Sequence, residues 1–330
     1  MPEPSFFSSA PVITREEILA ARSPRTLHDP WQPQSFFLEE ERSREGSVDS
    51  VATVFLTNRE CPYTCLMCDL WKNTTTFQVP SGAIVAQIRH ALAHLPPATH
   101  IKLYNSGNFF DTKAVPPEDL PQIASLLSSL KTVIVENHPA LCSTGCVDFQ
   151  KRLGTTQLEV ALGLETIHPD VLPRLGKGMT LDDFSGAVEF LHRHNIRTRA
   201  FILLRPPFLS EEEGREWAIR SIDYAFSLGV DCCTIIATRG GNGIMELLTE
   251  KGWYSPPRLD SLEWVLEQSV PHHSGRVFAD TWGLERISTC PDCLSRRTQR
   301  MHRTNCTQSI QPRETCHCQQ DAIDIAAIQS

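Results

Sequence analysis

The sequence predicts an α/β protein with a partial (β/α)6 barrel of parallel strands, of the TIM type, and a cysteine-rich C-terminal tail. Short runs rich in Val, Ile, Thr and aromatic residues alternate with helical segments through most of the chain. Polar residues, glycines and cysteines follow the ends of those runs, and more cysteines gather near the C-terminus. Alternating strands and helices favour a parallel sheet covered by helices, curled towards a barrel or, as the alternative, open and doubly wound.

Six runs have the composition of strands. They are residues 51–57, 99–104, 131–136, 157–165, 197–204 and 230–237. We divide the chain into an N-terminal extension (1–50), a core (51–285) and a tail (286–330). The extension contains the charged run "LEEERSREGS" at 38–47, which we interpret as solvated, with at most a short helix nearby, because no periodicity is sustained there.

Helix signals fill the segments between the predicted strands. Thr180 and Asp183 form a capping-box pair, and Ser210 and Glu213 repeat it ahead of a second apolar stripe. Residues 84–95 place their apolar side chains three and four positions apart. Each of these segments is therefore predicted to be a helix that crosses between parallel strands.

Composition limits the function classes. A chain of 330 residues with 41% hydrophobic content can bury a large core, and its formal charge of -8 argues against a globally basic nucleic-acid binder. No apolar run reaches bilayer-spanning length, and the N-terminus lacks the features of a secretory signal, so we expect a cytoplasmic protein with no membrane partner. The twelve cysteines are clumped, which is typical of metal ligands and not of a disulfide framework.

Three cysteines, Cys61, Cys65 and Cys68, follow the first predicted strand in "RECPYTCLMCDLW". A structural zinc site needs four ligands, and no fourth Cys or His lies close by in sequence. A [4Fe-4S] cluster tolerates three thiolates when its fourth iron binds something other than protein. The alternatives are a redox pair at Cys65 and Cys68, or half of a zinc site completed by distant residues.

Other polar residues follow the later strands. They are Asn105, Ser106, Gly107 and Asn108, then Glu136, Glu165, Arg205 and the "RGGNG" run at 239–243. In parallel α/β folds the carboxyl ends of the strands share one face, so we expect these residues to meet the three cysteines at one mouth. "RGGNG" is too short to be a phosphate loop by itself and is interpreted as a turn.

The "CPYTCLMC" segment resembles the C-x3-C-x2-C signature of the radical S-adenosylmethionine (radical SAM) superfamily. That resemblance implies a [4Fe-4S] cluster on Cys61, Cys65 and Cys68, whose open iron is chelated by S-adenosylmethionine (SAM). Reductive cleavage of SAM then yields a 5'-deoxyadenosyl radical, which abstracts a hydrogen from substrate. Many members carry an aromatic residue before the third cysteine, where this chain has Met67, a soft apolar side chain that can still cover the cofactor.

The resemblance also implies cofactor-binding roles at the strand ends. Ser106, Gly107 and Asn108 hold the place of the segment that meets the methionyl amino group, although its acidic member is missing. Glu136 and Glu165 stand where family members place carboxylates for the ribose hydroxyls or the amine. Arg205 would pair with the SAM carboxylate. For each charged residue the alternative is a surface ion pair.

Longer segments, such as "VATVFLTNRECPYTCLMCDLWKNT" and "FILLRPPFLSEEE", resemble the branch that contains the radical subunit of archaeosine synthase. The elongator catalytic subunit and the methylthiotransferases are more distant. The likeness spans about residues 50–285. It implies modification of a tRNA base, with a one-electron donor of the flavodoxin or ferredoxin type. The alternatives are a radical SAM enzyme for a small molecule or peptide, and a non-catalytic metal-binding protein on the same fold.

The tail holds a second group of thiols, Cys290, Cys293, Cys316 and Cys318. Two close pairs separated by 22 residues suit zinc, and an auxiliary iron–sulfur cluster is the alternative. The segment between the pairs is basic. Between residues 286 and 303 the arginines are Arg286, Arg296, Arg297, Arg300 and Arg303, against one acidic residue after Arg286, Asp292. They predict either contact with phosphates or a solvated helix face.

Overall fold

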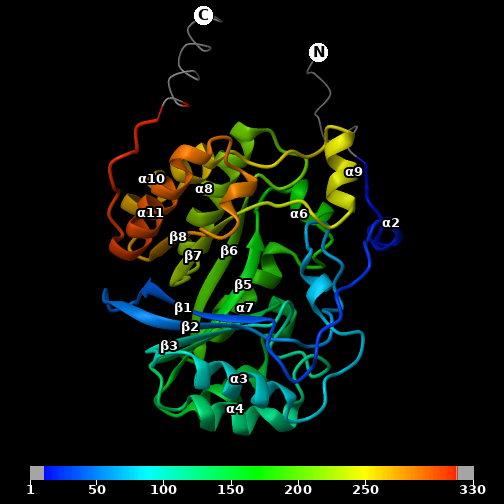
Figure 1. Ribbon diagram of the computed structural model, residues 1–330, viewed down its shortest axis with the longest axis vertical. Coiled ribbons are helices and arrows are strands. Elements are labelled where there is room, and N and C mark those ends of the chain that lie inside the picture. Colours follow the sequence, from blue (N-terminus) through cyan, green and yellow to red (C-terminus); the bar gives the residue numbers. More distant parts are fainter. Residues whose placement is uncertain (1–10, 317, 319–330) are drawn as a thin grey trace, which may run out of the picture.

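The computed structural model describes residues 11–316 and 318. Eight strands form one sheet in the order β1-β2-β3-β4-β5-β6-β7-β8, curled into a half-barrel with helices outside it (Figure 1). All neighbours from β2 to β8 are parallel, and β1 alone pairs antiparallel, with β2. The predicted α/β half-barrel is confirmed.

The strands are β1 (Ser35–Arg42), β2 (Val48–Phe55), β3 (His100–Tyr104), β4 (Thr132–Asn137), β5 (Gln157–Glu165), β6 (Arg197–Leu204), β7 (Cys232–Ala237) and β8 (Arg276–Ala279). Strands β2 to β7 coincide with the six predicted runs. Strands β1 and β8 were not predicted: β8 has only four residues, and β1 lies in a charged segment.

The α-helices are α2 (Arg15–Ala20), α3 (Ala83–His94), α4 (Leu120–Leu127), α5 (Thr144–Leu153), α6 (Val171–Arg174), α7 (Leu181–Arg193), α8 (Glu211–Ser227), α9 (Ile244–Glu250), α10 (Leu259–Ser269) and α11 (Pro291–Thr307). Short 3-10 helices are η1 (Leu70–Asn73), η2 (Pro117–Asp119), η3 (Pro139–Leu141), η4 (Val270–His272) and η5 (Leu284–Arg286). Both predicted capping boxes are present, Thr180 with Asp183 and Ser210 with Glu213. None of the helices in the described part of the chain is long and apolar enough to cross a membrane.

The interpretation of residues 38–47 as a solvated run is wrong for Glu39 and Glu41, although Glu40, Arg44 and Glu45 of this run are exposed. Glu39 and Glu41 lie on β1, and Lys102 of β3 binds both carboxylates, at 2.8 and 2.6 Å. Arg199 of β6 donates to Glu41 across the interior of the half-barrel, at 2.6 Å. The alternate residues of this charged segment therefore line the inner face of the half-barrel, as alternate residues of any strand share one face.

A charged network continues along that inner face. Glu159 of β5 binds Arg199 at 2.8 Å and Arg276 of β8 at 2.9 Å, and its side chain is almost fully buried. Buried ions of this kind are tolerated only when they are paired and hydrogen-bonded. The opposite face of the sheet carries the main hydrophobic core, for example Ile101, Val133 and Ile202, beneath the helices.

Helix α11 covers the open edge of β8. The Asn305 side chain exchanges two hydrogen bonds with the backbone of Ala279, and Gln308 does the same with Val277, at 2.8 to 3.0 Å. Both side chains thus satisfy edge groups that a ninth strand would otherwise pair with. At its other flank α11 approaches β1, where Arg42 donates to the Cys306 carbonyl. The predicted domain boundaries at residues 50 and 285 stay predictions. However, β1, which precedes residue 50, is a strand of the sheet, and α11, which follows residue 285, packs against its edge.

Candidate metal and cofactor site at the mouth of the half-barrel

The three cysteines of the first motif lie in the loop that leaves β2. Burial is the largest influence on all three thiols: it raises the pKa of Cys61, raises that of Cys65 to about 11, and raises that of Cys68 further. The protein alone therefore keeps these thiols protonated, and a metal centre must displace their protons to bind thiolates. Three sulfur donors without a fourth suit a cluster with one open iron.

The loop after β3 contacts the first of these cysteines. The Asn108 amide donates to the Cys61 sulfur at 3.2 Å. Gly107 lies against the same cysteine, since a Cβ atom placed on it would be in van der Waals contact with the Cβ of Cys61, at 3.5 Å. The predicted meeting of these two loops is therefore observed.

Glu136, at the end of β4, braces the same loop. Its carboxylate accepts hydrogen bonds from the backbone amides of Asn105, at 2.6 Å, and Gly107, at 3.2 Å. Burial raises the pKa of Glu136 to about 7, although these amides oppose the shift. Asn105 is fully buried, and neither polar atom of its side chain has a partner in the described structure. Such orphaned amides usually await a ligand or water, which fits a polar cofactor beside Cys61.

Glu165, at the end of β5, pairs with a residue that sequence reasoning missed. Lys177 donates to its carboxylate at 2.5 Å, and both side chains are about nine-tenths buried. Burial opposes the lysine charge, but Glu165 and the thiol of Cys65 outweigh it and raise the pKa of Lys177 to about 12. A Cβ atom on Gly163 would collide with both members of this pair. The run "LGKGM", a lone lysine between two glycines at 175–179, was the available signal.

Arg205 is engaged elsewhere. Its guanidinium binds Glu211 at 2.6 Å and donates to the carbonyls of Leu209 and Pro256. Among the described contacts, none joins Arg205 to the cysteine loop. Lys177, and not Arg205, is the cation that influences the first cysteines.

Three of the strand ends have a residue with an unusual backbone conformation. Ser106, Glu165 and Arg205 have φ values of 52°, 65° and 53°, in the left-handed region that non-glycine residues rarely adopt. Each follows or ends a parallel strand at the same mouth. Strain of this kind is retained mostly where a site requires it.

Other strand-end loops fix the position of the cysteine loop. Tyr63 stacks on His138, which follows β4, with ring centroids 3.9 Å apart. The Asn242 amide donates to the carbonyls of Leu66, at 2.8 Å, and Cys68, at 3.2 Å. Asn242 is buried within "RGGNG", so this run does more than make the predicted turn. The sequence alone gave no signal that Asn242, and not another residue of this run, contacts the cysteine loop.

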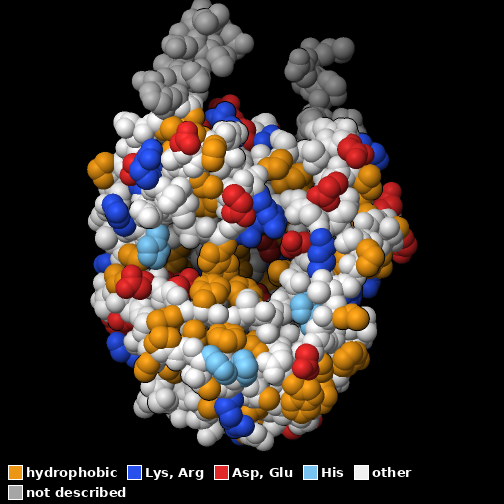
Figure 2. All heavy atoms as spheres, viewed as in Figure 1, with side chains coloured by type: hydrophobic (Ala, Val, Ile, Leu, Met, Phe, Trp, Pro, Cys, Tyr) orange, Lys and Arg blue, Asp and Glu red, His pale blue; other side chains and the backbone are white. Residues whose placement is uncertain are grey.

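A cavity of about 240 Å³ opens beside this site. Its lining includes Leu70, just after the third cysteine, Glu136 at the strand end, and Lys102 and Arg199 from the inner network. Figure 2 shows the molecule hollowed where β1 faces β6 and β7, with hydrophobic and charged side chains around the hollow. The cavity thus joins the cysteine mouth to the polar interior of the half-barrel.

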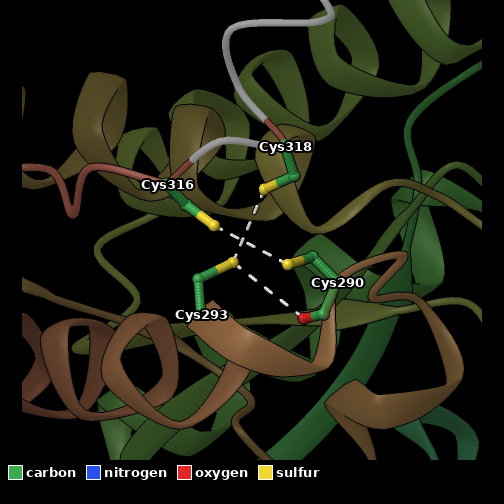
Figure 3. Close-up of side chains that lie close together, drawn as sticks. All are labelled: Cys290, Cys293, Cys316 and Cys318. Atoms are coloured by element: carbon green, nitrogen blue, oxygen red, sulfur yellow. Dashed lines mark hydrogen bonds between the residues drawn. The ribbon is translucent and has the colours of Figure 1, made fainter.

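The C-terminal thiols come together as predicted. Cys290 and Cys293 stand at the start of α11, and the sulfur atoms of Cys316 and Cys318 point towards them from the following segment (Figure 3). The tail beyond these ligands, 319–330, and residue 317 lie outside the described residues.

The basic segment between the thiol pairs is a helix, and two of its arginines cannot contact phosphates. Arg297 and Arg300 are 5% and 4% exposed. Arg297 binds Asp260 and Glu263 of α10, and Arg300 binds Glu263 and Glu267. For these two, both predicted roles are wrong, because their charges are already neutralised inside the protein. Arg286, Arg296 and Arg303 remain exposed.

At the SAM site that the sequence predicts, we expect Lys177→Met to weaken SAM binding at least about tenfold, because the variant removes a cation that acts on Cys65 and leaves Glu165 buried without its partner. Equilibrium binding of SAM to the anaerobic, cluster-loaded protein measures this. Lys151→Met is the control, since Lys151 makes an exposed pair with Asp148. Equal affinities in the Lys177 variant and the wild type would contradict the role.

No family model matches the chain, but individual relatives do. It is 31% identical over 243 residues to the archaeosine synthase subunit beta of Thermococcus kodakarensis, which covers 70% of this chain and 74% of that protein. It is 30% identical over 224 residues to the subunit of the same name from Methanosarcina acetivorans, covering 63% of this chain and 62% of that protein. The crystal structure of Streptococcus suis SuiB shares the fold, with a TM-score of 0.51 at 12% identity over 71% of this chain and 49% of that one.

A three-thiol loop at the mouth of a parallel half-barrel, together with these relatives, defines an enzyme of the radical SAM class. Within that superfamily the chain belongs to the family of the archaeosine synthase beta subunits.

Proposed function

We propose that this enzyme holds a [4Fe-4S] cluster on Cys61, Cys65 and Cys68, cleaves SAM reductively, and uses the resulting radical to modify a base of tRNA. The observation that supports the chemistry most is the contact between the three-cysteine loop and the loop after β3, where Asn108 donates to the Cys61 sulfur and the side-chain amide of Asn105 has no partner in the described structure. When bound, the cluster supplies the electron that breaks a carbon–sulfur bond of SAM. A protein of the flavodoxin or ferredoxin type would return that electron.

The residues of the mouth then have separate tasks. Glu136 and Asn105 offer oxygen atoms to the methionyl amino group, while Ser106, Gly107 and Asn108 bring their backbone close to it. Lys177, held by Glu165, places a positive charge where a carboxylate can bind. Arg205 steadies the loop between β6 and α8 through Glu211, which is a supporting task.

The substrate proposal draws on the relatives. Two proteins named archaeosine synthase subunit beta align with most of this chain, and that name implies a second subunit. We infer that this chain, too, works with a partner subunit on a tRNA base. The cavity of about 240 Å³ is large enough for part of one base and is lined by both aromatic and charged side chains, such as Tyr104, Trp282 and Asp280.

Mass spectrometry of nucleosides from tRNA tests the substrate. A strain that lacks the gene should lose one modified nucleoside and accumulate its precursor. The wild-type gene should restore it, Cys142→Ala should restore it equally, and Cys65→Ala should not. An unchanged nucleoside profile in the deletion strain would contradict the tRNA assignment. If purified protein still forms 5'-deoxyadenosine, a small-molecule or peptide substrate then replaces tRNA; if it forms none, the non-catalytic alternative stands.

A further inference from the structure

The four C-terminal thiols have the spacing of ligands to a single metal ion. The sulfur atoms of Cys290 and Cys316 are 3.7 Å apart, as are those of Cys293 and Cys318 (Figure 3). All four sulfur atoms lie within 4.8 Å of one another. Four thiolates around one tetrahedral ion at about 2.3 Å must lie about 3.8 Å apart. We propose that these four cysteines bind one structural zinc ion.

The same spacing favours a single zinc ion over an auxiliary cubane cluster at this place. Thiolates on a [4Fe-4S] cluster lie roughly 6 Å apart, because each is bonded to a different iron. In the described part of the chain, the C-terminal quartet is the only group of three or more metal-binding side chains whose ligand atoms are this close. The two cysteine groups therefore differ in kind: one is compact and closed by four ligands, and the other is wider and has three.

The zinc ion would close a loop around α11. Cys290 is the N-cap residue of that helix, and Cys316 follows the segment that turns back after its C-terminal end. Arg300 donates to the carbonyls of Gln311 and Pro312 in that segment, at 2.8 to 2.9 Å, and Arg313 binds Glu267 of α10 at 2.6 Å. The metal would add a link between the start of α11 and the end of this segment, next to the ion pair of Arg296 with Glu314 at 3.4 Å.

Helix α11 matters to the enzyme because it forms a wall of the central cavity. His302 and Asn305 line that cavity, and Asn305 also pairs with the edge of β8. A zinc ion that fixes α11 therefore fixes this wall of the cavity. Because zinc has no redox chemistry, its role there is structural.

Metal analysis of the full-length protein, purified and loaded with iron anaerobically, tests the site. We expect about one zinc and four iron atoms per chain. Cys316→Ser and Cys290→Ser should lose at least about 90% of the zinc and keep the iron. Cys306→Ser, a matched control on α11 outside the quartet, should keep both metals. The Cys61→Ala/Cys65→Ala/Cys68→Ala variant should lose iron and keep zinc.

The zinc-free variants should also melt several degrees lower and still form 5'-deoxyadenosine when reduced with SAM. Eight irons per chain, falling to four in Cys316→Ser, would overturn the proposal in favour of a second cluster. Zinc content that Cys290→Ser and Cys316→Ser leave unchanged would overturn it as well. Should those variants fail to fold, zinc-edge X-ray absorption of the wild type decides: four sulfur neighbours at about 2.3 Å are expected, and any nitrogen or oxygen shell contradicts the four-thiol site. None of these readouts depends on the tRNA proposal.

Discussion

Cys65→Ala is expected to abolish cluster binding and to lower 5'-deoxyadenosine formation at least about 100-fold, because loss of a direct ligand should exceed the 10- to 100-fold effect of losing its hydrogen-bonded neighbours. The Cys65 thiol is partly buried and lies within the electrostatic reach of Lys177 and Glu165. Alanine at this place leaves the cluster with two thiolates. Iron content, the visible absorption of the anaerobic protein, and chromatography of the nucleoside product measure the change.

Cys142→Ala is the matched control, because Cys142 is also partly buried and follows a strand end, yet the described contacts of its sulfur, with Asn137, the His138 carbonyl and Cys146, all lie outside the three-cysteine loop. It should keep its iron and its activity. Undiminished 5'-deoxyadenosine from Cys65→Ala would rule out the cluster assignment for this motif, and equal losses in both variants would point to general destabilisation instead.

Arg199→Met is expected to lower the free energy of unfolding by about 3 kcal/mol, at the lower end of the cost of breaking a buried ion pair from one side. Arg199 is 2% exposed and binds both Glu41 and Glu159. The cost stays at the lower end because Lys102 still neutralises Glu41 and Arg276 still neutralises Glu159. Urea denaturation of the variant and the wild type gives the difference.

Arg220→Met serves as the control, because Arg220 makes an exposed pair with Glu216, for which about 1 kcal/mol or less is expected. Comparable destabilisation by the two substitutions would show that the inner network adds nothing beyond a surface pair.

The charged network of the inner face should also make the stability of the protein depend on pH in the acid range. Burial opposes the charge on Glu41, but Arg199 and Lys102 outweigh it and hold the pKa of that carboxyl well below its usual value. A depressed carboxyl pKa stabilises the folded state above the unfolded pKa, about 4.3, and that stability is lost as the pH falls further. The wild type should therefore lose stability below about pH 5, and Arg199→Met should lose less of it. An identical acid dependence in both proteins would contradict this origin.

The half-barrel and the first cysteine motif could be predicted because their signals are local. Strand composition, helix caps such as Thr180 with Asp183, and three thiols at fixed spacing all lie within short stretches of chain. Steric and hydrogen-bonding preferences of neighbouring residues determine such features, so they survive without knowledge of the fold. The rule that strand ends share one face correctly predicted that Asn108 contacts Cys61, and it placed Glu136 against the same loop.

The role of each charged residue was decided by tertiary structure. Glu41 pairs with Arg199 across 158 positions in sequence, so a run that is locally charged and polar lies inside the half-barrel. Arg297 and Arg300 are buried against α10, while Lys177 and not Arg205 faces the cysteine loop. The sequence by itself predicted most of the secondary structure, although not β1 and β8, and it placed Cys61, Cys65 and Cys68 in the loop after a core strand. Only the folded chain decided which charges are solvated, which are paired and which face the cofactor, because the energy of a charge depends on burial and on partners that are distant in sequence.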